Sequence, residues 1–146
     1  MENFFTELIE RDLLKLREEL AAFKNEEHLW ATLPGVTNSV GNLSLHLIGN
    51  LNHFIGATLG QTGYVRQRDM EFSTRGVSRE HIIAEIDKVR DMVGRVLGGL
   101  APDVLEAQYP FEIFGQRSTG FYLTHFYGHL TYHLGQINYL RRILEG

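Results

Sequence analysis

Residues 125–136, HFYGHLTYHLGQ, lie at the centre of the segment that best defines the fold of this 146-residue chain. His125, His129 and His133 recur at intervals of four in it. On a helical wheel, His129 and His133 share one arc with the large apolar residues of the segment, and His125 lies at its rim. Those apolar residues are Tyr122, Phe126, Leu130, Ile137 and Leu140. The pattern predicts a helix over about 119–144 whose buried face carries imidazoles.

Three further segments show the same helical periodicity. Residues 3–24, about 39–60 and about 79–98 each place apolar side chains at steps of three and four. Pro and Gly residues interrupt the chain between these segments, and Ser39, Ser78 and Ser118 are candidate N-caps, with Asn38 and Thr119 as alternatives at the first and last positions. The sequence therefore predicts an all-α chain forming one domain over 1–146, an antiparallel up-and-down four-helix bundle.

Two long loops are expected, one after the second helix and one after the third. They cover residues 61–76 and 102–119 and are polar or turn-rich, apart from a short FEIF stretch at 111–114. Long loops in compact domains are often functional. Both loops are therefore candidates for the walls of a binding pocket.

Composition excludes several classes of function. The chain has no cysteine, so it can form neither disulfides nor a thiolate metal site. Its net charge of −4 and its lack of a basic run argue against nucleic-acid binding. The N-terminal segment is amphipathic rather than signal-like, and no stretch is apolar enough to span a membrane. A cytoplasmic protein without membrane or nucleic-acid partners is expected.

The histidine spacing indicates a metal site. Side chains at i and i+4 of a helix project to the same side, so His129 and His133 can reach one ion. A third ligand must come from a facing helix, and residues 39–60 offer a polar strip of Asn42, His46, Asn50 and His53. His46 is the nearer candidate, but periodicity alone does not choose between His46 and His53. His28 and His81 are expected to be surface groups.

These segments resemble a known family. NLSLHLIGNLNHFIG at 42–56, together with HFYGHLTYHLGQINYLRR at 125–142, is similar to the DinB-like (YfiT-like) family of metal-binding four-helix bundles. The family motif has one histidine on the second helix and an H-x-x-x-H pair, followed by G-Q, on the last. It maps onto His46, His129 and His133.

The resemblance implies a divalent metal ion, usually zinc or nickel, held by these three histidines, and it implies frequent homodimers. Some members of the family are S-transferases that use low-molecular-weight thiols. The stretch RQRDMEF at 66–72 is instead similar to a loop in a branch without an assigned reaction.

We therefore expect a metal-dependent enzyme of the thiol S-transferase or thiol-addition kind, acting on a small molecule. The alternatives are a hydrolase that uses metal-bound hydroxide and a non-catalytic stress-response protein. No residue is identified as the general acid or base. Candidates for supporting a ligand or contacting substrate are Asn50, His53, His125, Gln136 and Arg66. A ferritin-like di-iron site is excluded because no histidine follows a glutamate by three positions.

Overall fold

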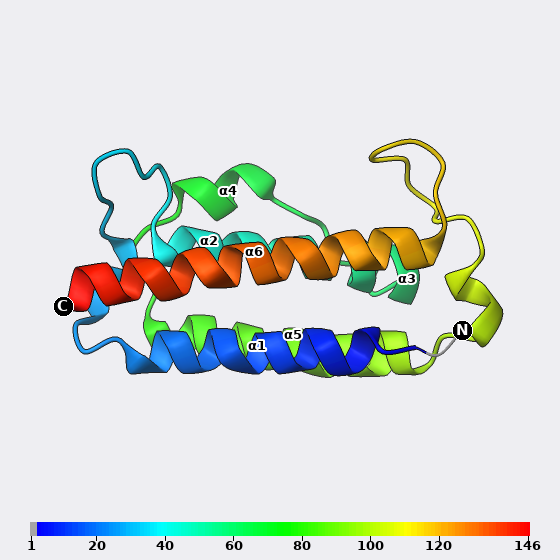
Figure 1. Cartoon of the computed structure of the whole chain (residues 1–146), viewed down its shortest axis with the longest axis horizontal. Helices are drawn as coiled ribbons and strands as arrows, with labels where there is room; N and C mark the ends of the chain where they lie inside the picture. The colour runs from blue at the N-terminus through cyan, green and yellow to red at the C-terminus, as the bar shows by residue number, and fades with distance from the viewer. Residues whose placement is uncertain (1–2) are drawn as a thin grey trace.

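The computed structural model describes residues 3–146 as four long helical segments that lie side by side (Figure 1). They are α1 (Phe5–Ala22), α2 (Val40–Leu51), α5 (Arg79–Gly98) and α6 (Thr119–Glu145). Residues 3–146 contain no β-strand, only an isolated bridge between Gln108 and Ser118. The prediction of an all-α chain is thus confirmed. Residues 1 and 2, which the predicted domain includes, lie outside the described residues.

Short helical elements connect or extend the long ones. α2 continues into a π-helical segment, η2 (Asn52–Ala57), and then into α3 (Thr58–Gly60). The connections contain the 3₁₀ helix η1 (Glu26–Trp30), the helix α4 (Arg68–Ser73) and the 3₁₀ helix η3 (Pro102–Leu105). Residues 111–114 adopt bends rather than a strand.

Serine hydroxyls begin three of the long helices. Ser39, Ser78 and Ser118 each accept a hydrogen bond from the backbone N–H three residues later. Such caps satisfy one of the N–H groups that a helix start leaves without a partner. The sequence therefore located these helix starts to within a residue.

The order of helix directions differs from the prediction. A Cβ atom on Gly60, at the end of α3, would lie 2.5 Å from Val96 Cγ2 near the end of α5, and Gly56 similarly faces Met92. The α2–α3 segment and α5 therefore run parallel, as Figure 1 shows. The expected up-and-down order is wrong at this pair, because residues 61–78 return along the bundle before α5 begins.

α1 and α6 form a second parallel pair. Arg11 on α1 donates to the Tyr127 hydroxyl on α6 at 2.7 Å, and Asn138, further along α6, donates at 2.6 Å to Glu19, further along α1. α1 is antiparallel to α5, since Arg17 donates to Asp87 at 3.1 Å while Glu10 lies next to Gly94. The bundle thus consists of two parallel pairs of opposite direction.

Part of the first expected loop is helical. α4 lies along α2 on the outside of the bundle (Figure 1). A helix of this length is not stable alone and gives little periodicity to detect. Contacts with α2, described below, hold it in place.

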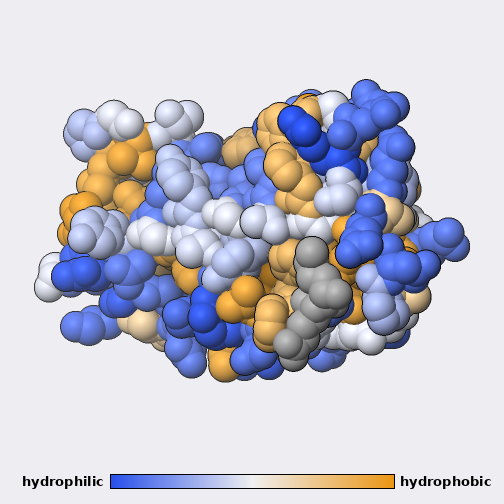
Figure 2. Space-filling view, turned by 45° about the vertical axis from the view of Figure 1, so that its right-hand side comes forward, coloured by the Kyte–Doolittle hydropathy of each residue, from blue (hydrophilic) through white to orange (hydrophobic). Residues whose placement is uncertain are grey.

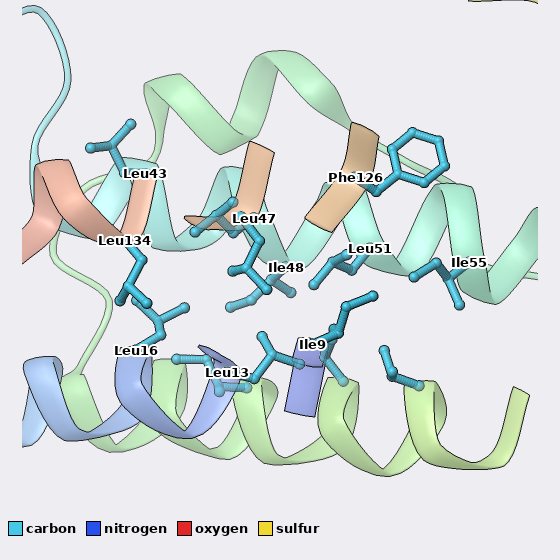
Figure 3. Close-up of a cluster of buried hydrophobic side chains, with 14 of the residues drawn as sticks. Ile9, Leu13, Leu16, Leu43, Leu47, Ile48, Leu51, Ile55, Phe126 and Leu134 are labelled. Atoms are coloured by element: carbon cyan, nitrogen blue, oxygen red, sulfur yellow. The ribbon is translucent and has the colours of Figure 1, made fainter. Parts of the chain in front are cut away.

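One apolar core fills the space between the long helices. Figure 3 shows side chains of α1, α2 and α6 directed towards one another. Burying a leucine or isoleucine side chain contributes about 1.5–3 kcal/mol, so this core supplies the main stabilisation. Among its fully buried members are Ile9, Leu13, Leu16, Leu47, Leu51, Ile55, Ile86, Leu130 and Ile137.

Candidate metal centre

Three histidines from two helices converge at the α2–α6 contact. One nitrogen each from His46, His129 and His133 lies within 4.8 Å of the other two. Nε2 of His46 is 3.0 Å from Nε2 of His129, and the rings of His129 and His133 have centroids 4.6 Å apart. Nitrogens bound to one tetrahedral zinc ion lie about 3.4 Å apart, given Zn–N bonds of about 2.1 Å. The three rings are therefore within small side-chain movements of a common ion.

His46 is held by a carboxylate. Its Nδ1 lies 3.0 Å from Oε1 of Glu71 on α4, and both residues are buried. Because a carboxylate only accepts hydrogen bonds, the proton of a neutral His46 lies on Nδ1, and Nε2 keeps a free lone pair directed at His129. This carboxylate–histidine arrangement is common behind metal ligands.

The negative charge of the Glu71 carboxylate is balanced by an arginine. Arg66 donates from Nε to Oε2 at 2.9 Å and from an Nη atom to Oε1 at 3.0 Å. Burial alone would raise the pKa of Glu71, but hydrogen bonds from His46 and Arg66 and the charge of Arg66 hold it below its usual range. Glu71 is therefore ionised at neutral pH.

His133 has a partner on its own helix. Its Nδ1 lies 2.7 Å from Oε1 of Gln136. An amide oxygen accepts, so Nδ1–H donates and Nε2 of His133 is free to bind an ion. Two of the three imidazoles are thus fixed in the tautomer that presents Nε2.

His129 lies in surroundings that disfavour its charged form. Burial, followed by the neighbouring His133 and His46, lowers the pKa of His129 to about 3. The ring is therefore neutral at pH 7, the form that binds metals. Its buried Nδ1 atom has no hydrogen-bond partner among the described residues. Taken together, three clustered imidazoles, of which His46 and His133 present Nε2, fit a divalent ion.

Comparison with known proteins agrees with this geometry. A family model described as the DinB superfamily matches residues 8–137, a span that contains His46, His129 and His133. The chain belongs to the DinB superfamily. A search of curated proteins gave no match to this DinB-superfamily chain.

The structure also separates the two candidates for the third ligand. His46 joins the pair on α6, whereas His53 lies outside the cluster, in the π-helical segment η2, and packs against Phe54 and Phe111. Burial, with a smaller contribution from the charge of Arg66, lowers the pKa of His53. His53 is therefore a neighbour of the centre rather than a ligand in this conformation.

The other predicted site residues of this DinB-superfamily chain have varied surroundings. Asn50 is buried, and its Oδ1 accepts no hydrogen bond from any residue in the part of the chain that the structure describes. His125 packs on the Phe114 ring, and its centroid is 6.5 Å from that of His129. Arg66, which we expected to be able to contact substrate, has its guanidinium bound to Glu71 instead.

The two histidines expected at the surface lie away from the centre. His81 is exposed at the start of α5. His28 is only half-buried, yet its Nδ1 lies 2.8 Å from Oε2 of Glu145 near the end of α6. It therefore has a structural partner rather than solvent alone.

Glu71 is the site residue that sequence reasoning missed. It lies in a segment expected to be an irregular loop, and nothing in its local pattern distinguishes it from Asp69 two positions earlier. The available signal was Gly49 in the middle of α2, since a glycine inside a helix often marks a close approach by another group.

A cleft of about 470 Å³ lies beside the histidine cluster and includes His133 in its wall. It is formed by residues 35–38, the start of α2 and the C-terminal part of α6. Figure 2 shows hydrophobic side chains gathered at the left-hand end of the molecule, where these elements lie. Among residues 3–146, His133 is the one titratable acidic or basic side chain that lines the cleft. The other main lining residues are Val36, Leu43, Tyr132, Gln136, Tyr139, Leu140 and Ile143.

No helix within residues 3–146 is both long enough and apolar enough to cross a lipid bilayer.

Proposed function

We propose that this DinB-superfamily protein holds a divalent ion, zinc or nickel, through His46, His129 and His133 and acts on a small thiol as an S-transferase or thiol-addition enzyme. The main support for the proposal is the 3.0 Å distance between the Nε2 atoms of His46 and His129, because imidazoles from two different helices meet there. Imidazole nitrogen suits both metals.

The donor set favours thiol chemistry over hydrolysis. A divalent ion with three neutral ligands keeps its full charge and lowers the pKa of a thiol or water that binds to it. Among the described residues, the carboxylate nearest to the cluster is Glu71, and it is already bound to His46 and Arg66. A thiol, with a pKa near 8.5, needs less help from a protein base than water does.

The cleft beside His133 supplies a place for the substrate. Its volume of about 470 Å³ lies within the range of small-molecule sites. Apolar side chains and the phenol rings of Tyr132 and Tyr139 form most of its wall. These surroundings suit a ligand with a neutral, apolar body whose sulfur reaches the centre past His133.

The test uses protein prepared without a histidine tag and loaded with cobalt(II). Adding benzyl mercaptan should change the visible absorption of the cobalt protein, and a His133→Ala variant should show no such change. His81→Ala is the matched control, because His81 is exposed and outside the cluster. The proposal is overturned if thiols leave the spectrum unchanged while simple esters are hydrolysed in a His133-dependent manner.

A further inference from the structure

The segment that crosses over the bundle between α3 and α5 is anchored on the first turn of α2. We define the crossover segment as residues 66–75. The side-chain amide of Asn42, which is 1% exposed, donates to the carbonyl oxygens of Glu71 at 3.0 Å and Thr74 at 2.8 Å. Arg75 in turn donates to Oδ1 of Asn42 at 2.8 Å. Buried hydrogen bonds of this kind fix the position of α4 on α2.

Gly49 provides the space that the Glu71 side chain occupies. A Cβ atom at position 49 would lie 1.8 Å from Oε2 of Glu71 and 2.6 Å from its Cδ. Glycine inside a helix costs about 1 kcal/mol relative to alanine, and Gly49 lies well inside α2. The close approach of the carboxylate accounts for glycine at this position.

Arg66 allows the buried carboxylate of Glu71 to remain ionised. The side chains of Arg66 and Glu71 are 12% and 7% exposed, and they form a two-point ion pair. A buried charge without such a partner is strongly destabilising. The crossover segment therefore brings its own counter-charge to the carboxylate that contacts His46.

We propose that Glu71 is a positioning residue of the metal centre, and that docking of the crossover segment on α2 and binding of a divalent ion favour each other. Glu71 keeps the proton of His46 on Nδ1 and the ring directed at His129, so the ion meets a ligand that is already oriented. By linkage, an ion bound at Nε2 stabilises the docked position of Glu71 to the same extent. This inference rests on the metal centre of the proposed function and adds the residues that control its affinity.

Gly49→Ala tests the proposal without changing any charged or metal-binding group. The new methyl group must displace the Glu71 carboxylate, which is the free end of a flexible side chain, rather than the helix backbone. We expect the variant to fold and to bind zinc about 10- to 100-fold more weakly than the wild type, the usual loss when a partner of a metal ligand is removed.

Gly128→Ala is the matched control. Gly128 adjoins His129, but a Cβ atom there would meet nothing within 4 Å. Zinc affinity should be unchanged in this variant, measured by competition with a chromophoric chelator. Equal zinc affinities of the two glycine variants would overturn the proposal.

Substitutions of Glu71 itself keep the proposal testable if Gly49→Ala does not fold. Gln retains an oxygen that can accept from His46, whereas Ala does not. Zinc affinity should therefore fall in the order wild type, Glu71→Gln, Glu71→Ala. Asp69→Asn, an exposed position on the same helix, should bind zinc like the wild type.

Hydrogen exchange measures the coupling in the other direction. Zinc should slow amide exchange of residues 66–75 in the wild type, and it should have little effect on this segment in Glu71→Ala. If the wild type binds zinc but amide exchange of residues 66–75 does not change, the coupling is overturned and the histidine centre is not. A wild type that binds no zinc would overturn both the centre and the inference.

Discussion

The Nε2 atoms of His46 and His129 lie 3.0 Å apart although 83 positions separate the two residues in the chain. Two imidazoles that meet in this way, with His133 beside them, predict one divalent ion per chain. His46→Ala removes a ligand. Its zinc affinity should therefore fall by more than the roughly 10- to 100-fold loss expected when a hydrogen-bond partner of a ligand is removed. Elemental analysis after dialysis checks this, and equal metal content in wild type and variant would remove His46 from the site.

The cleft beside His133 should select its ligands by charge. Ile143 is 60% exposed at the cleft wall, so Ile143→Asp should fold normally and keep its zinc. The zinc-loaded variant should bind benzyl mercaptan roughly tenfold more weakly, because a carboxylate, which is costly to desolvate, replaces an apolar side chain of the cleft wall. Calorimetry with benzyl mercaptan and with anionic 2-mercaptoethanesulfonate measures the effect. A wild type that prefers the anionic thiol would contradict this use of the cleft.

Glu145 should make stability sensitive to acid. Its carboxylate accepts hydrogen bonds from the backbone N–H groups of Lys24 and Asn25 and from His28. These bonds, that from Lys24 first, lower the pKa of Glu145 from 4.5 to about 2. The stabilisation is therefore complete above about pH 4.5 and is lost as the pH falls towards about 2.

Thermal unfolding as a function of pH tests this expectation. Glu145→Gln should lower the melting temperature at pH 7 and flatten the dependence on pH between about 4.5 and about 2. Glu18→Gln, at an exposed position on α1, serves as the control. Identical pH profiles for Glu145→Gln and the wild type would show that the contact between the end of α6 and η1 contributes nothing.

A substitution at Leu13 should reduce the stability of the core without affecting the metal centre directly. It is fully buried on α1, which carries none of the three histidines. Leu13→Ala should reduce the free energy of unfolding by about 2–5 kcal/mol. The adjacent Leu14 is 40% exposed, and Leu14→Ala should change the free energy of unfolding by about 0.5 kcal/mol or less. Urea denaturation of the metal-free proteins compares them, and similar losses in both would contradict the assigned helix face.

Local pattern was sufficient for the long helices and for the pairing of His129 with His133 on one helix face. The apolar spacing of α1 and α5 and the serine caps are properties of neighbouring residues, so they can be predicted from the sequence. His129 and His133 share a helix face for the same reason. The choice of His46 over His53 was not available from periodicity, because both lie on one strip of α2 and η2; the packing of α2 against α6 decides it.

The features that the sequence did not predict depend on contacts between distant segments. α4 is too short to be stable without α2, so the role of Glu71 arises only when the crossover segment reaches Gly49. The parallel direction of α2 and α5 is likewise set by the path of residues 61–78 rather than by either helix.

This return path is longer than the geometry demands. The stretch from Val40 to Gly60 is roughly 30 Å long at the helical rise, and about ten extended residues would cover that distance. Residues 61–78 are more than this minimum, and the additional length includes α4, the helix that carries Glu71. A trimmed, glycine-rich connector should thus join the same two helices and leave a bundle in which His46 has lost its carboxylate partner.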